Sequence, residues 1–576
     1  NNGSVLAGIG VVNGNTVITG LLSPGKMANV ADLIANGSIT NASQVVGNSA
    51  GTLTFNGNVT LGANSATLID IDGNNKVPGG PGTFDKIIVT GAGHVFTANG
   101  TLVPTLRDTI GTPSNYIPKV GTRFDFVQAV DGAQTTGTFT TLLQPASGLS
   151  ANTRLDLIYA PNAITLHVTP TSFTNMVRNT NPDTPDGTIS NILDRNRVAS
   201  GGVPGARTKP LYDSFYELES EADYATATHQ LGGPGVPGVT SAAMLGMQGF
   251  MGSVSDRQDA LNGGAGGVQI ATSQPVSFAY ANRTLSAEAS RAEAAFASLT
   301  PVMPSSDGWG VWAQGFGRWS TVGDSGGLAG SNSRTGGFTV GADRLLASDL
   351  IGGVAFGFAR TTSTSSGARA TSESYTGSLY ASWTPGAAVI DLRAAAGPSR
   401  IQTSRDLILT NAPVTGSASG FGAGVVLEAG YRIPAGVLTL KPFANVAWQG
   451  FRRGGYTETQ QPFGLTFPSQ YFEKVTTTLG IAASTQTRYA NGVTLMPEFK
   501  LGWAHDWRDT TLVTQAALLD EPFSIGGAQP GREAAVFGMK LTGWTHESLR
   551  LFVAYNGELR TNAASHQLSG GARYTW

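Results

Sequence analysis

The chain has 576 residues, no cysteine and a formal net charge of −2 at pH 7, and only 13% of its residues are charged. This composition argues against nucleic-acid binding, which needs a basic surface, and it excludes disulfides, a thiol nucleophile and a cysteine-ligated metal. The length exceeds that of one ordinary domain, and apolar residues alternating with polar ones favour β-sheet over disorder.

The first residues, Asn1-Asn2-Gly3, include no initiator methionine, no basic segment and no apolar segment. A secretory signal would show both a basic and an apolar segment at this position. We therefore expect the sequence to be a processed or truncated piece whose export signal lies upstream.

Residues 1–170 consist of short alternating runs separated by Gly and Asn, of which 51–61 (GTLTFNGNVTL) and 85–91 (DKIIVTG) are the clearest. Gly and Asn tolerate positive φ and so favour tight corners between strands. Short strands at near-regular spacing, without helices, predict a parallel β-helix, in which stacked rungs share one core. A β-sandwich would give many of the same signals and is the alternative.

Residues 171–209 lose this alternation and are rich in Asn, Pro, Asp and Arg, which predicts a linker. Residues 210–307 follow as a helical region. Its first helical pattern spans 210–231 and is stopped by the Gly- and Pro-rich run 232–238, because Pro and Gly end helices. A second pattern spans 241–261 and a third spans 284–299.

The second helical pattern carries an apolar stripe of Met244, Met247, Phe250, Met251 and Val254. Taken alone, such a stripe favours packing of one helix on another. Its place before the C-terminal region, which is predicted below to form a barrel, favours a helix inside the pore of that barrel, since about 20 helical residues cover about 30 Å. The third pattern, 284–299, is the alternative candidate for the pore.

Residues 308–576 alternate apolar and polar side chains throughout, as in Val354, Phe356 and Phe358, which are separated by small residues. No window reaches the roughly 18 apolar residues that a membrane helix needs. Five short turns alternate with six longer polar loops, among them 361–371, 453–470 and 508–532. This pattern predicts an antiparallel transmembrane β-barrel of about twelve strands, with both ends of the barrel on the short-turn side, which in an outer membrane is the periplasm.

This C-terminal region resembles the translocator domain of autotransporters (type V secretion), and the similarity covers all of 308–576. The segments that carry it are 310–317 (GVWAQGFG), 335–343 (TGGFTVGAD), 428–433 (EAGYRI), 441–444 (KPFA), 479–481 (LGI) and 523–527 (FSIGG). In addition, 21–25 (LLSPG) and 137–139 (GTF) resemble the C-terminal end of autotransporter passengers.

The resemblance implies a bacterial outer-membrane protein that exports its own N-terminal part, with residues 1–170 at the cell surface. It also implies three kinds of partner: outer-membrane lipid, the outer-membrane assembly machinery and periplasmic chaperones. The barrel-terminal assembly signal would be Leu568, Tyr574 and Trp576, where Trp replaces the Phe that more often ends the family. Some relatives cut the chain between paired Asn in the pore helix, and 241–261 contains no such pair.

Aromatic residues on the lipid side of a barrel gather at the two membrane interfaces. The alternation places Trp309, Trp383, Trp448, Trp503 and Tyr555 among the candidates for these aromatic girdles.

Three motifs point to chemistry, and a structural interpretation is preferred for each. The segment 323–327 (GDSGG) copies the surroundings of a trypsin-like serine, but it falls in a surface loop with no second domain to complete a triad. The six histidines lack the i, i+4 spacing typical of metal ligands. The segment 70–74 (DIDGN) lacks the Glu that closes an EF-hand.

The sequence therefore predicts an all-β protein: a parallel β-helix fragment, then a β-barrel with an α-helix in its pore. We expect transport and display of the passenger, with no catalytic residues, no cofactor, no metal and no nucleic acid. The ligand of the passenger is not encoded in these residues. Two alternatives remain: an adhesin retained at the surface, and the carrier of an enzyme whose catalytic part lies upstream of Asn1.

Overall fold

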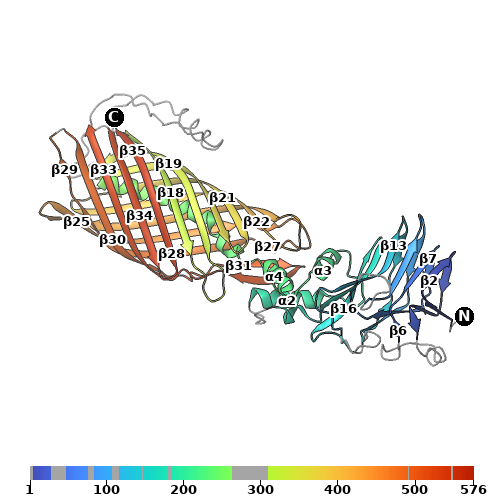
Figure 1. Cartoon of the computed structure of the whole chain (residues 1–576). Coiled ribbons are helices and arrows are strands. Elements are labelled where there is room, and N and C mark those ends of the chain that lie inside the picture. Colours follow the sequence, from blue (N-terminus) through green and yellow to red (C-terminus); the bar gives the residue numbers. More distant parts are fainter. Residues whose placement is uncertain are drawn as a thin grey trace.

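The computed structural model describes residues 4–27, 47–75, 83–106, 116–145, 147–177, 184–262, 309–490, 492–546 and 549–575. The molecule is elongated (Figure 1). A solenoid of short strands forms the N-terminal end, a large barrel forms the C-terminal end, and a group of helices lies between them.

The N-terminal solenoid is built from three sheets of stacked strands. The first sheet contains β1 (Val5–Gly8), β4 (Leu21–Pro24), β9 (Ala66–Ile71), β12 (Thr101–Leu106) and β15 (Thr141–Leu142). The second contains β2 (Gly10–Asn13), β7 (Thr52–Asn56), β10 (Lys86–Thr90) and β13 (Arg123–Val130) in parallel, followed by β17 (Ala163–Pro170) and β16 (Thr153–Ala160). The third contains β3 (Thr16–Ile18), β8 (Val59–Leu61), β11 (Val95–Ala98) and β14 (Gln134–Gly137). A separate pair is formed by β5 (Lys26–Met27) and β6 (Gly47–Ser49).

Equivalent strands of successive turns lie parallel and in register, such as Ile87 against Leu53 and against Val127. The side chains that point inward form one continuous core, in which Phe55, Phe96 and Phe124 are fully buried. Parallel sheets and a shared core confirm the predicted β-helix and rule out the β-sandwich. The antiparallel hairpin β16–β17 pairs with β13 and ends the parallel stack on the side that faces the helices.

Between the solenoid and the barrel, the described residues (171–177 and 184–262) contain six helical segments. They are η2 (Phe173–Asn175), α2 (Pro185–Asn196), α3 (Lys209–Tyr216), α4 (Glu221–Leu231), α5 (Val236–Thr240) and α6 (Ala242–Asn262). Within the described residues, no helix combines the length and the apolar character required to cross a membrane.

Two features of this region differ from the sequence-based expectation. The expected linker, 171–209, contains α2, because its Pro and Thr begin a helix: the Thr184 hydroxyl accepts the Gly187 N–H and Pro185 takes the first helical position. The helical pattern over 210–231 is two helices, because Ser220 caps a new helix by accepting the Asp223 N–H. The third pattern, 284–299, lies outside the described residues.

Twelve antiparallel strands form the closed barrel, as predicted, and the first strand pairs with the last over its whole length. They are β18 (Trp309–Val322), β19 (Ser331–Ala347), β20 (Leu350–Ser365), β21 (Ala368–Trp383), β22 (Ala388–Arg405), β23 (Val414–Tyr431), β25 (Leu438–Arg453), β28 (Gln470–Ser484), β30 (Thr494–Asp506), β33 (Glu533–His546), β34 (Leu549–Arg560) and β35 (Ala563–Thr575). The short strands β24 (Ile433–Ala435) and β29 (Thr487–Arg488) extend two of the short turns.

The loops at the other end are more ordered than expected. Residues 361–371, predicted as a polar loop, are mostly strand, and only Ser366 and Gly367, both with positive φ, form the turn. The hydroxyls that suggested a loop point into the lumen, where Ser363 and Thr361 are buried and bonded to Ser333 and Thr335. Two other loops contribute β26 (Tyr456–Thr457), β27 (Thr466–Phe467), β31 (Val513–Leu518) and β32 (Glu521–Gly526) to a four-stranded sheet, here called the loop sheet.

Candidate functional site: the barrel and its lumen

The outer face of the barrel changes character along each strand, and β21 illustrates the change. From the short-turn end its outward residues are Trp383, Ala381, Leu379, Gly377 and Tyr375, followed by Glu373, Thr371 and Arg369. Between Trp383 and Tyr375 the face is apolar, and beyond Tyr375 it is polar. An apolar band bounded by aromatic rings is the signature of a lipid-facing barrel wall, and the polar segment extends beyond the membrane on the long-loop side.

The predicted girdle residues lie on this outer face at different heights. Trp309 and Trp383 are exposed at the short-turn end, and the Trp383 indole N–H donates to Asp349 at 3.0 Å. Trp503 is exposed nearer the long-loop end, and its indole N–H donates to Glu533 at 2.6 Å. Trp448 lies in the long-loop half of β25.

The remaining predicted residues of the barrel wall are the girdle candidate Tyr555 and the three residues of the terminal signal. Tyr555 lies midway along β34, where its hydroxyl meets His566 Nδ1 at 2.7 Å, so it lies between the two aromatic levels. Of the predicted terminal signal, Leu568 is exposed on the outer face and Tyr574 is half-buried at the short-turn end. Trp576 lies outside the described residues.

Helix α6 runs through the lumen, with its N-terminal end at the long-loop mouth and its C-terminal end near the short turns (Figure 1). In its first half Met244, Met247, Phe250 and Val254 are buried, and Met251 is half-buried. The wall makes room for them with glycine: a Cβ at Gly357 would lie 2.4 Å from the Phe250 ring, and one at Gly422 would lie 2.7 Å from Met247 Cε. Large helix side chains therefore fit against glycine positions of the wall.

The second half of α6 carries four consecutive polar residues, 256–259, here called the polar collar. Consecutive helix residues point about 100° apart, so these four reach all sides of the lumen. Asp256 accepts hydrogen bonds from Gln314, Asn556 and Ser569, at 2.9, 3.2 and 2.8 Å. Gln258 donates to the carbonyl oxygens of β21 and β22. The collar thus contacts opposite sides of the wall at one level.

Arg257 joins the collar to the wall through a buried ion pair. Its guanidinium binds Asp343 of β19 through two bonds of 2.7 and 2.6 Å, and both side chains are only 2–3% exposed. The Tyr380 hydroxyl also donates to Asp343, at 2.8 Å, and the Trp312 indole donates to Tyr380 at 2.7 Å. A buried, bidentate pair with its remaining oxygens bonded fixes both the height and the rotation of the helix.

Asp259 completes the collar in a mixed ionic cluster. Its carboxylate lies 3.1 Å from Lys441 and 3.9 Å from Lys500, and both ammonium groups also approach Glu428. Asp259, Glu428 and Asp391 are the one group of carboxylates in the described residues whose spacing could hold a metal ion. The two lysines already supply positive charge there, so the cluster is better described as an ion-pair network.

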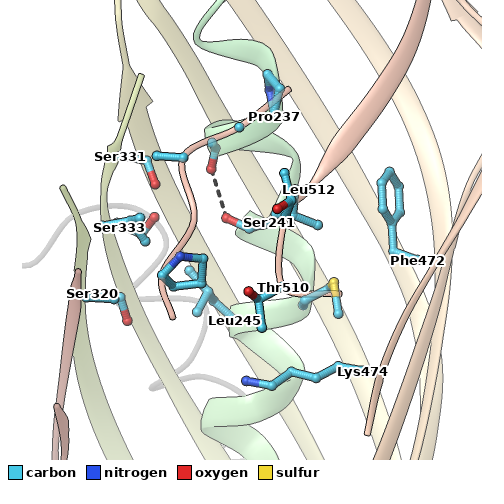
Figure 2. Close-up of a pocket in the computed structure, with 18 of the residues that line it drawn as sticks. Pro237, Ser241, Leu245, Ser320, Ser331, Ser333, Phe472, Lys474, Thr510 and Leu512 are labelled. Carbon is cyan, nitrogen blue, oxygen red and sulfur yellow. Dashed lines mark hydrogen bonds between the residues drawn. The ribbon is translucent and has the colours of Figure 1, made fainter. Parts of the chain in front are cut away.

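A cavity of about 390 Å³ remains between the helix and the opposite wall, near the long-loop mouth. Figure 2 shows Pro237, Ser241 and Leu245 of the helices facing Lys474 and Phe472 across it. Three of its charged lining residues form a cluster: Asp506 lies 3.3 Å from Lys474 and 2.8 Å from Arg560. At the long-loop mouth, helix α6 therefore packs on the side of β20 to β23 and leaves space beside β28, β34 and β35.

The motif that copies a serine protease forms part of a loop contact. The Ser325 hydroxyl accepts a hydrogen bond from the Gln529 backbone N–H at 2.9 Å, and Asp324 accepts from Gly330 at 2.7 Å. Gly326 and Gly327, both with positive φ, form the turn that brings Ser325 back to Leu328. These bonds hold the loop that contains Ser325 against the loop that contains Gln529.

The sequence pattern predicts the apolar half of the pore helix but not the polar residues that hold the helix in the lumen. The sequence did contain an indication of these contacts, because 256–259 are four polar residues in succession on a helix. Such residues point in all directions, so they cannot all lie on one solvent-exposed face of the helix. The partners Asp343, Lys441 and Lys500 lie 86 or more positions from the collar residues that they bind, so no local pattern links them to the collar.

Residues 311–556 match the family model of the autotransporter beta-domain. Among curated proteins, an extracellular serine protease of Serratia marcescens is 26% identical over 274 residues, which cover 46% of this chain and 26% of that protein. The chain thus spans about a quarter of the length of the curated relatives it matches.

Among solved structures, the translocator domain of NalP from Neisseria meningitidis aligns with 15% identity and a TM-score of 0.39, over 50% of this chain and 94% of that one. The beta domain of the Bordetella autotransporter BrkA aligns with 19% identity and a TM-score of 0.37, over 47% and 100%. The transport unit of AIDA-I from Escherichia coli aligns with 14% identity and a TM-score of 0.34, over 50% and 98%.

Proposed function

Because residues 311–556 are an autotransporter beta-domain, a barrel of the bacterial outer membrane, we propose that this chain exports its own N-terminal part and displays it at the cell surface. The exported part is the β-helix of residues 1–170 together with helices α2 to α4. The barrel anchors this part in the membrane, and helix α6 closes the lumen once export is complete.

The observation that carries this proposal is the path of the chain. Both barrel termini lie on the short-turn side, yet the solenoid and α2 to α4 lie beyond the long-loop mouth (Figure 1). Helix α6 connects the two sides through the lumen, where the polar collar holds it. A chain arranged in this way has its N-terminal part on the far side of the membrane from its barrel termini.

The experiment compares the complete chain with one that lacks β35, both produced with the same export signal. Strand β18 pairs with β35, so without it the barrel cannot close. External protease on intact cells should remove the β-helix from the complete chain and leave the truncated chain uncut. Equal protection of both chains would contradict export, and equal digestion of both would contradict a role for the barrel.

We further propose the partners and the absence of catalysis as parts of this function. The apolar band on the outer face supports contact with outer-membrane lipid. The match to the autotransporter beta-domain supports the outer-membrane assembly machinery and periplasmic chaperones as further partners. Among the described residues, the one motif that copies a catalytic serine is engaged in loop packing. Catalysis by these residues is therefore not part of the proposal.

A second candidate function is transport of an enzyme. The observation that favours it is the name of the Serratia marcescens relative, an extracellular serine protease. On this alternative, residues 1–170 would connect a catalytic part to the barrel. Hydrolysis of a general protease substrate by cells that carry the complete gene product, abolished by a serine-directed inhibitor, would favour it over display of a binding surface.

A further inference from the structure

The helices between the solenoid and the barrel share one apolar core with the loops of the barrel. This core, here called the junction core, contains buried side chains from η2 and from α2 to α5. It also contains buried side chains from three loops of the barrel and from the first residue of β23, namely Leu407, Leu409, Val414, Phe463, Leu465, Phe467, Ala516, Leu518, Phe523 and Ile525. Two strands of the loop sheet, β31 and β32, supply four of them.

Polar contacts join the same partners around the junction core. Arg195 and Asn196 at the end of α2 both bind Glu521 of the loop sheet, the latter at 2.5 Å. Arg405 of β22 binds Glu458 in one loop and also donates to the Gln230 carbonyl of α4 at 2.7 Å. The loops are therefore fitted to the helices by both apolar and charged side chains.

The segment 202–206, between α2 and α3, is exposed except for Pro204, and it divides this assembly into two sets of elements. On its N-terminal side are the solenoid, η2 and α2, and on its C-terminal side are α3 to α6 and the barrel. The Phe173 ring packs against Tyr212, Phe215 and Tyr224, with ring centroids 4.9 to 6.2 Å apart. The Tyr212 hydroxyl donates to the Leu193 carbonyl at 2.7 Å, and Asp186 meets His229 at 2.8 Å.

The solenoid adds contacts of its own to the C-terminal set. Arg123 of β13 binds Glu217 at 2.5 Å, and His167 of β17 binds the Tyr216 carbonyl oxygen at 2.8 Å. Arg197, which follows α2, donates to the Tyr216 hydroxyl at 3.2 Å. The covalent connection through 202–206 is thus one of many links between the two sets.

We infer that the loops of the barrel, with α3 and α4, form a docking surface for residues 1–205 of the same chain, so that the β-helix stays on the cell after the chain is cut between α2 and α3. This inference rests on the proposed function, because it assumes that the β-helix has reached the surface. It specifies the mode of display as retention through the junction core, independent of an intact chain.

The test inserts a site for a specific protease between Gly205 and Ala206, both of which are exposed. Intact cells carrying the otherwise complete protein are treated with that protease and washed at pH 7.5. The fragment of residues 1–205 should be cut quantitatively, remain with the cells, and be released by urea. Its appearance in the wash without denaturant would overturn the inference.

Two variants separate docking by the junction core from nonspecific adhesion. Phe523→Ala empties a buried position of the loop sheet, and the cut fragment should leave the cells on the order of a hundredfold faster, because the loss of a buried ring leaves a cavity in the core. Ile408→Ala, in a loop that also contributes to the core, shortens a side chain that is 45% exposed and should release the fragment at the rate of the unaltered chain. Equal release from both variants would contradict docking through the core.

The same experiment distinguishes failure of this inference from failure of the proposed function. A site that external protease cannot cut on intact cells would mean that the β-helix never reached the surface. A site that is cut with immediate loss of the fragment would leave export intact and refute only retention. Heat-modifiable gel migration of each variant verifies that its barrel is folded.

Discussion

At the scale of single residues, the buried pair of Arg257 and Asp343 is the most sensitive contact of the pore. Replacing Arg257 by Ala leaves the Asp343 carboxylate buried without its principal partner, which costs about 3 to 5 kcal/mol. We expect Arg257→Ala to lower the temperature at which the detergent-extracted protein loses its folded gel mobility, and to loosen α6 toward protease.

The matched control removes an arginine of the barrel wall, Arg360 of β20, that belongs to a weak pair. Arg360 lies 3.9 Å from Glu373 and both side chains are about 40% exposed, so Arg360→Ala should cost at most about 1 kcal/mol. Equal shifts for Arg257→Ala and Arg360→Ala would show that the helix is not held by the buried pair.

The outer face of β21 provides a residue-scale test of membrane placement. Leu379 is 67% exposed and lies between the aromatic levels at Trp383 and Tyr375, whereas Thr371 lies on the same face beyond Tyr375. Leu379→Arg should destabilise the barrel in lipid by about 2 to 4 kcal/mol, and Thr371→Arg by about 0 to 1 kcal/mol. Unfolding by denaturant in bilayers measures both, and similar costs would mean that the apolar band lies elsewhere.

At the scale of elements, His167 connects the hairpin that ends the β-helix to helix α3. Burial is the main reason that its pKa falls from 6.5 to about 4, so the folded state holds a neutral ring whose Nδ1–H donates to the Tyr216 carbonyl. A lowered pKa means that the unfolded chain binds the proton more readily. The stability contribution is therefore complete above about pH 6.5 and is lost as the pH falls toward 4, by on the order of 3 kcal/mol in all.

His167→Gln keeps an N–H donor that does not titrate. The whole protein is unfolded in urea at pH values between 4 and 7, and unfolding of its N-terminal part is measured by protease susceptibility. The urea concentration needed for unfolding should depend less on pH in this variant than in the unaltered chain. An unchanged pH profile would exclude His167 as the titrating link between the two elements.

The elements also show what sequence patterns convey and what they cannot. The β-helix and the twelve strands were predictable because apolar and polar residues alternate with a period of two along each of them. In β21, which contains Leu379, this alternation shows which residues face outward and which face the lumen. The strand around Ser363 was predicted as a loop because hydroxyl residues are common both in loops and on the lumen-facing side of a barrel wall. Pairings such as Arg257 with Asp343 depend on the closed barrel and have no local signal.

At the scale of the whole molecule, display requires one orientation: the solenoid outside the cell, the short turns in the periplasm, and α6 between them. The loop sheet and the junction core have meaning for display only if they lie on the outer side. Every contact of the polar collar is equally consistent with a barrel inserted the other way, so the orientation requires a direct test.

Because the chain has no cysteine, single cysteines report position without background. Val17 is 72% exposed on the β-helix, and Val437 is 86% exposed in a short turn. On intact cells a membrane-impermeant maleimide should label V17C and not V437C, and it should label both once the outer membrane is permeabilised. Labelling of V437C but not V17C on intact cells would contradict the account.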